Sequence, residues 1–160
     1  MSILIYAEYA EGKFKKAAFE LASYAKKVAE SLGTTVTAVT INAGDVSELS
    51  KYGVDKVLKV NNDELSGFTA KAYADVIKQA AQKENIKLLL LSSTTDSVYL
   101  SSLVAVALEA GYASNVVGLP VSTSPFQVKR TAFSNKAFMI TEINTEVKVL
   151  GIAKNFYGIF

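Results

Sequence analysis

The chain has 160 residues, of which half are hydrophobic and a fifth are charged, with seventeen basic against fifteen acidic side chains. This length and composition favour a single domain over residues 1–160 with a sizeable core, and they argue against disorder. The chain has no cysteine and no histidine, which excludes disulfides, thiolate metal sites and the commonest general base.

Apolar strand patterns alternate with amphipathic helical patterns through the first half of the chain. Strands are predicted at residues 2–7, 34–41, 56–60 and 86–91. Helices are predicted at 13–31, 45–49 and 67–83, the first of them ended by Gly33. This alternation indicates an α/β fold, a three-layer α/β/α arrangement with a mainly parallel, doubly wound sheet.

The segment 86–111 reads as a buried strand, a polar turn and a helix that ends at Gly111. Its strand has no polar face, which favours a central position in the sheet. The turn lies at the carboxyl end of a parallel strand, where a helix N-terminus offers free N–H groups to a ligand. The candidate residues of this helix N-terminal turn are Thr94, Thr95, Asp96 and Ser97. The alternative is that Thr95, Asp96 or Ser97 only caps the helix.

The last third of the chain changes character. After a short apolar strand at 115–121 there is no helical period, and β-rich runs follow at 126–133, 137–143 and 147–152. Turns at 134–136 and 144–145 predict two hairpins, and so a C-terminal antiparallel β-meander. Residues 155–160 include three aromatics, which favours either a tail docked on its own domain or a surface that meets a partner.

Motifs for chemistry are missing from the sequence. No GxGxxG or GxxxxGK[ST] pattern occurs, so dinucleotide-binding and P-loop sites are not expected. The sequence has neither a GxSxG motif nor a histidine, so a serine nucleophile is not expected. The carboxylates Glu8, Glu11, Glu142 and Glu146 are best explained as solvated surface groups. We therefore predict no catalytic residue and no metal site.

The location of the protein is also suggested by composition. Basic residues are scattered, which does not indicate nucleic-acid binding. No apolar run approaches about 20 residues, and the chain begins with a strand pattern rather than a signal peptide. We expect a cytoplasmic protein without membrane insertion.

Four segments in this order and spacing resemble the N-terminal domain of the electron transfer flavoprotein alpha subunit: residues 3–8, 92–97, 128–137 and 147–152. The most specific segment is an arginine hairpin, in which the matching residues are Arg130, Thr131, Phe133, Lys136 and Ala137. Asn135 stands where that family usually has glycine, and it tolerates the same left-handed turn.

The resemblance implies a subunit of a heterodimeric electron carrier rather than an enzyme. In the full heterodimer FAD would carry electrons from flavin dehydrogenases, such as acyl-CoA dehydrogenases, to a quinone reductase or another acceptor. Alpha subunits of this family continue into a second domain that holds most of the FAD, so no cofactor is expected on this chain alone. The domain would be mainly architectural and would pack on the beta subunit.

The resemblance also implies that Arg130, Asn135 and Lys136 face the cofactor-binding cleft between domains. The alternative interpretation is that Arg130 closes an ion pair and that residues 134–136 form an ordinary turn. A second function also stays open, a stand-alone adenine-nucleotide-binding module with the polar turn 92–97 on the phosphates.

Overall fold

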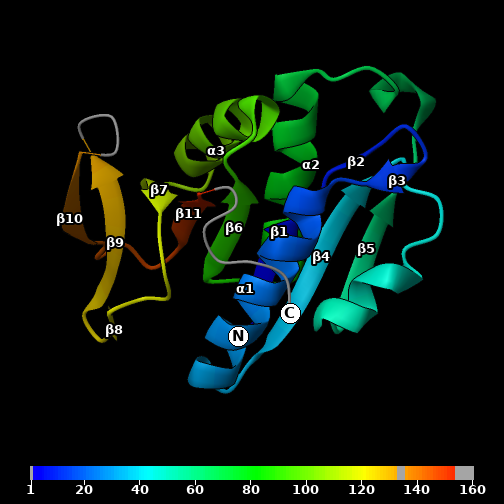
Figure 1. The fold of residues 1–160 in the computed structure, drawn as a ribbon. Coiled ribbons are helices and arrows are strands. Elements are labelled where there is room, and N and C mark those ends of the chain that lie inside the picture. The colour runs from blue at the N-terminus through cyan, green and yellow to red at the C-terminus, as the bar shows by residue number, and fades with distance from the viewer. Residues whose placement is uncertain (1, 133–135, 154–160) are drawn as a thin grey trace.

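A mixed, mainly parallel sheet forms the centre of the computed structural model, which describes residues 2–132 and 136–153 (Figure 1). Its described strands are β1 (Ser2–Tyr6), β4 (Thr35–Ile41), β5 (Lys56–Val60), β6 (Leu88–Ser92), β7 (Gly111–Val116), β8 (Ser122–Thr123), β9 (Phe126–Ala132), β10 (Ala137–Glu142) and β11 (Lys148–Ile152). The order across the sheet is β10-β9-β7-β11-β6-β1-β4-β5, and β8 pairs with β9. A small antiparallel pair, β2 (Tyr9–Ala10) and β3 (Lys13–Phe14), follows β1.

Helices cover both faces of this sheet, as predicted. One face packs against α1 (Lys16–Leu32), and the other packs against α2 (Ala70–Lys83) and α3 (Thr95–Ala107). The division follows the alternation of side chains along a strand, since Ile3 and Ile5 enter the core beneath α1 whereas Leu4 enters the opposite core. The 3-10 helices η1 (Ser47–Tyr52) and η2 (Asp63–Leu65) complete the connections. The predicted α/β class and doubly wound sheet are confirmed.

Strand β6 is central, as its uninterrupted apolar sequence predicts. All five of its residues are buried, and it pairs in parallel with β1 on one side and with β11 on the other. Leu90 lies opposite Ile5 of β1 and Leu150 of β11, so its side chain is enclosed on all sides. The carboxyl end of β6 therefore lies in the middle of the sheet edge.

The last strand corrects our prediction. Strands β9 and β10 form the expected antiparallel hairpin, with Met139 opposite Arg130. Strand β11, however, inserts in parallel between β6 and β7, so the predicted hairpin at 144–145 is wrong. Its buried Val149 and Leu150 need cover on both faces, which only the middle of the sheet provides. Antiparallel strands are confirmed at one edge only.

Boundaries also differ around α3 and after β1. Gly111 begins β7 instead of ending α3, so the strand expected at 115–121 lies at Gly111–Val116. The segment between β1 and α1 contains the β2–β3 hairpin, in which Glu11 and Gly12 have φ values of 56° and 79°. Two successive positive φ values are typical of a tight hairpin turn. The apolar segment 155–160 lies outside the described residues.

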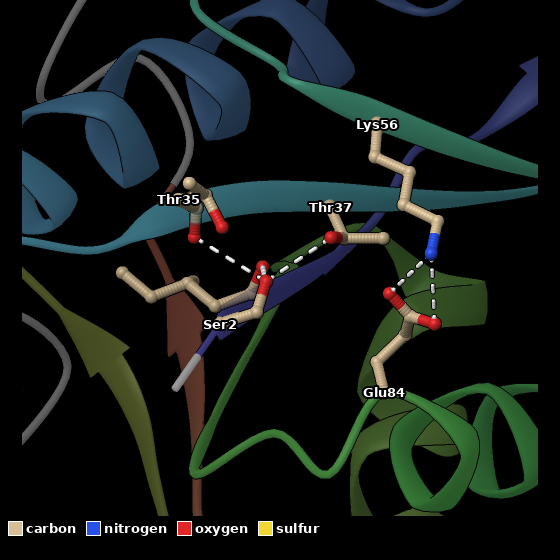
Figure 2. A network of polar contacts seen from close by, with 6 residues as sticks. Ser2, Thr35, Thr37, Lys56 and Glu84 are labelled. Atoms are coloured by element: carbon tan, nitrogen blue, oxygen red, sulfur yellow. Dashed lines mark hydrogen bonds and ion pairs between the residues drawn. The ribbon is translucent and has the colours of Figure 1, made fainter.

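The amino edge of the sheet is closed by the chain's own polar groups (Figure 2). The hydroxyl of Ser2 bonds to the Thr35 carbonyl at 3.4 Å and lies 3.0 Å from the Thr37 hydroxyl. Lys56 of β5 forms an ion pair with Glu84, at the C-terminus of α2, at 2.9 Å. The polar groups of the amino edge thus make contacts within the chain, and the polar turn 92–97 lies at the opposite, carboxyl edge.

Leu90→Ala tests the central position of β6. We expect it to lower the free energy of unfolding by about 2–5 kcal/mol, because the surrounding strands cannot collapse into the cavity. Urea denaturation followed by circular dichroism measures the change. Val106→Ala, at an exposed position of α3, is the control and should shift the value by less than about 0.5 kcal/mol. Equal effects of the two substitutions would contradict the packing.

Candidate functional site

The carboxyl edge of the sheet brings Glu8 and the polar turn 92–97 together. Glu8 follows β1, the turn follows β6, and these two strands are neighbours. Glu8 is only 5% exposed and accepts hydrogen bonds from the hydroxyls of Thr94 and Ser97. Its second carboxylate oxygen pairs with Lys15 at 3.0 Å. Our expectation that Glu8 is a solvated surface group is therefore wrong.

The turn itself is a helix cap. Thr94 is the N-cap of α3, and its hydroxyl oxygen accepts from the Ser97 N–H at 3.3 Å. The cap is thus one residue before the three residues that the sequence suggested. The hydroxyl of Ser93 donates to the Ile152 carbonyl at 2.8 Å, which ties the turn to β11. Thr95 is exposed and Asp96 is half-buried beside it.

The carboxylates of Glu8 and Asp96 lie near two tyrosines at this edge. The pKa of the Tyr6 hydroxyl is raised well above its usual value, first by burial and then by the nearby Glu8, Tyr73 and Asp96. Burial and Asp96 also raise the pKa of Tyr73. A phosphate on this turn would meet two carboxylates, and the Lys15 ammonium is already paired with one of them. The geometry therefore does not favour the phosphates of a nucleotide here.

A polar cleft of about 680 Å³ lies between the β2–β3 hairpin and the carboxyl ends of β4 and β5. Asn42 and Asn62 face each other across it, because the Asn42 amide donates to the Asn62 carbonyl at 3.0 Å and accepts from the Asn62 N–H at 2.7 Å. Tyr9 and Tyr73 also line the cleft, and none of its lining residues is basic. The sequence analysis missed this cleft, although an asparagine after each of two strands was a possible signal.

Arg130, the central residue of the arginine hairpin, is held by Ser114 of β7. Its Nε donates to the Ser114 carbonyl at 2.9 Å, and its terminal nitrogen contacts the Ser114 hydroxyl at 3.1 Å. Within residues 2–132 and 136–153, no carboxylate lies within ion-pair distance of this guanidinium. Lys136 is exposed, and Asn135 lies outside the described residues. The alternative that Arg130 closes an ion pair is therefore not supported by the described part of the chain.

The two predicted sets of site residues lie apart. Arg130 is on β9, whereas Thr94, Thr95, Asp96 and Ser97 follow β6, and the order of the sheet places β7 and β11 between them. Three strand spacings correspond to about 14 Å. The structure therefore provides a satisfied polar turn and a separate arginine on the strand next to the edge of the sheet.

These described residues do not make a flavin site on their own. Neither Arg130 nor Lys136 lines the 680 Å³ cleft or the apolar groove of about 530 Å³ between α2 and α3. The lining of the larger cleft includes acidic Glu11 and Asp63 but no cation. We therefore derive no flavin chemistry from this set of side chains.

The part of the chain that the structure describes contains no group of three or more potential metal ligands. Among its helices none combines the length and apolar composition that crossing a bilayer requires. The fold and the edge together define a doubly wound α/β domain with an antiparallel hairpin at one side and no catalytic constellation among the described residues.

Comparison with known proteins supplies the family. The model of the electron transfer flavoprotein domain matches residues 3–158, and the chain belongs to this family, as the N-terminal domain of the alpha-subunit type. The resemblance inferred from the arginine hairpin and the strand segments is thereby confirmed.

Several named relatives share this domain. The chain is 29% identical over 121 residues to protein FixB of Clostridium saccharobutylicum, an alignment that covers 74% of this chain and 36% of the relative. It is 32% identical over 123 residues to the electron transfer flavoprotein subunit alpha of Thermoanaerobacterium thermosaccharolyticum, covering 74% and 37%. The subunit alpha of Syntrophomonas wolfei is 27% identical over 147 residues, covering 92% and 46%. The chain thus spans less than half the length of these relatives.

Glu8→Gln tests the contact between β1 and the turn. The amide keeps an acceptor for Thr94 and Ser97 but removes the charge that strengthens both bonds and pairs with Lys15. We expect the free energy of unfolding to fall by about 1–3 kcal/mol in urea denaturation. Glu11→Gln, an exposed substitution in the β2–β3 turn, is the matched control and should have little effect. The assignment fails if both variants unfold at the same urea concentration as the parent.

The pH dependence of stability tests the burial of Tyr6. Above pH of about 10 the hydroxyl ionises in the unfolded chain, while its raised pKa keeps it protonated in the fold. The free energy of unfolding therefore falls as pH rises above about 10, by about 1.4 kcal/mol per pH unit for this group. Tyr6→Phe should make the alkaline loss of stability less steep, whereas Tyr99→Phe, on an exposed ring, should not. Parallel curves for the parent and Tyr6→Phe would show that Tyr6 ionises equally in both states.

Proposed function

We propose that this chain is the architectural N-terminal domain of an electron transfer flavoprotein alpha subunit and that it packs on a beta-type subunit. The family match and the relatives named subunit alpha support this proposal. The assembled heterodimer would accept electrons from flavin dehydrogenases and pass them to a quinone reductase or another acceptor. We propose a carrier rather than a catalyst, because the relatives are named electron transfer flavoprotein subunits.

The observation that carries the proposal is the uncovered apolar strand at the edge of the sheet. Phe138, Met139 and Ile140 of β10 are 55%, 46% and 54% exposed. Figure 1 shows β9 and β10 beyond β7, at the side of the sheet away from α1 and α2. Edge strands of free domains are usually protected by charges, prolines or bulges. Three successive exposed apolar residues there favour a surface that a partner covers.

The cofactor of the heterodimer would be FAD, which supplies the one- and two-electron chemistry when bound. We propose that most of its site lies in the part of the alpha subunit that corresponds to the remaining length of the relatives. Arg130 and Lys136 would place positive charge on the hairpin side of the cleft between domains. In this proposal Arg130 is pre-oriented, because two of its nitrogens are held by Ser114.

Co-expression with a beta-type subunit of this family tests the proposal. We expect a one-to-one complex by size exclusion with mass detection, and no flavin absorbance in its visible spectrum. Supplying the alpha C-terminal segment of a relative by fusion should add the flavin spectrum to the same complex. A chain that elutes as a monomer in the presence of every beta-type subunit tried would overturn the proposal.

Ile140→Lys locates the surface in that complex. A charge in the middle of a buried apolar contact should weaken the complex at least about tenfold, measured by calorimetric titration. Ser31→Lys, which adds the same charge to the exposed end of α1, is the control and should leave the affinity unchanged. An unchanged affinity for Ile140→Lys would remove the hairpin from the interface.

A further inference from the structure

Helix α3 has an unusual distribution of side chains. Its fully exposed residues, Thr95, Val98, Tyr99, Ser102, Leu103, Val106 and Ala107, carry no charge, and its one acidic residue, Asp96, is half-buried in the first turn. Two of its buried residues, by contrast, are serines, Ser97 and Ser101. The exposed faces of α1 and α2 show the usual composition, with Lys26, Lys27 and Glu30 on the first and Lys71 and Asp75 on the second. A helix that is apolar on all sides is normally covered on all sides.

The exposed face of α3 forms an apolar strip, and a groove lies beside it. Tyr99, Leu103 and Val106 follow the spacing of a single helical ridge, and Val106 is 80% exposed. Thirteen residues of helix extend about 20 Å. Leu103 and Ala107 also line the groove of about 530 Å³ next to α2, whose floor includes Ala74. One ridge beside one groove is the arrangement into which the side chains of another helix pack.

Charges on one flank indicate the chemistry of the occupant. Lys71 and Lys78 of α2 border the groove, and neither has a carboxylate within ion-pair distance in the described ranges. Asp75, between them, accepts a hydrogen bond from Gln79 at 2.7 Å. Two unpaired ammonium groups beside an apolar strip favour an occupant with Asp or Glu on that side.

The strip and the exposed hairpin lie on the same face of the sheet. Val128 of β9 enters the core beneath α1, so the next residue, Lys129, faces the side of α3. Lys129 pairs with Ile140 and its ammonium lies 4.3 Å from the ring centre of Phe138, so both apolar residues share that side. Strand β7 joins the two regions, because it pairs with β9 and packs beneath α3.

We propose that the outer face of α3 and its groove bind one amphipathic helix of the partner subunit. The apolar face of that helix would cover Tyr99, Leu103 and Val106, and its acidic flank would meet Lys71 and Lys78. This inference rests on the proposed heterodimer and adds to it a second surface, formed by a different element. The hairpin and α3 then contact one partner on one side of the domain.

Single-cysteine variants test the proposal, because the chain has no cysteine of its own. Val106→Cys places one thiol on the strip, and Ser31→Cys places one on α1, which packs on the opposite face of the sheet. The rate of maleimide alkylation is measured for each variant alone and with saturating beta-type subunit. We expect the complex to slow the Val106→Cys reaction at least about tenfold, since interface cores exclude solvent, and to leave Ser31→Cys unchanged.

Each other outcome overturns the inference in a distinguishable way. A complex that forms by mass but leaves Val106→Cys fully reactive removes α3 from the interface and leaves the proposed function standing. Protection that appears in the chain alone as its concentration rises assigns the strip to a second copy. Failure to form any complex overturns the inference together with the proposed function.

A charge-reversal pair tests the acidic flank. Lys71→Glu/Lys78→Glu should slow association with the beta-type subunit at least about fivefold at low salt, as expected when a steering charge is reversed. Lys26→Glu/Lys27→Glu makes the same change of net charge on α1 and is the control. If both double variants slow association equally, the effect comes from net charge and the acidic flank is excluded.

Discussion

The contact of the Glu8 carboxylate with the hydroxyls of Thr94 and Ser97 sets the character of the carboxyl edge. It joins the end of β1 to the first turn of α3 across the middle of the sheet, and it uses the hydroxyls that a ligand would otherwise engage. In many doubly wound proteins this position is a binding site for phosphate. Here the buried carboxylate of Glu8 occupies the position of the anion, so the hydrogen bonds that connect β1 to α3 explain the polar turn.

What the sequence predicted well were features that depend on local patterns. The uninterrupted apolar run of β6 indicated a central strand, and Gly33 indicated the end of α1, where its φ of 66° is found. The arginine hairpin was recognised from adjacent residues, and its antiparallel pairing is confirmed. The errors concern residues whose environment is set by distant segments. Glu8 was predicted to be a loop carboxylate, because the sequence does not show that β1 and β6 are neighbours. Strand β11 was predicted to continue the meander, because the sequence does not show that it lies between β6 and β7.

The predicted roles of Arg130, Asn135 and Lys136 toward a cofactor stay predictions. Sequence reasoning identified Arg130 because its surroundings resemble a family motif, but it could not show that Ser114 holds the guanidinium. The polar cleft near Asn42 and Asn62 was missed for a related reason. Each asparagine ends a different strand, and only the parallel pairing of β4 and β5 places the two together.

The polar and apolar parts of the surface lead to opposite conclusions. At the carboxyl edge the polar groups of the turn are largely satisfied within the chain, which leaves little free energy for a small charged ligand. At the side of the sheet the apolar residues of β10 and of α3 are exposed, with no cover among the described residues. Burial of such surface contributes about 25 cal/mol per Å² when a partner covers it. The exposed apolar surface among the described residues therefore favours association with another protein surface, and the architectural role of this domain in an electron carrier stays a proposal.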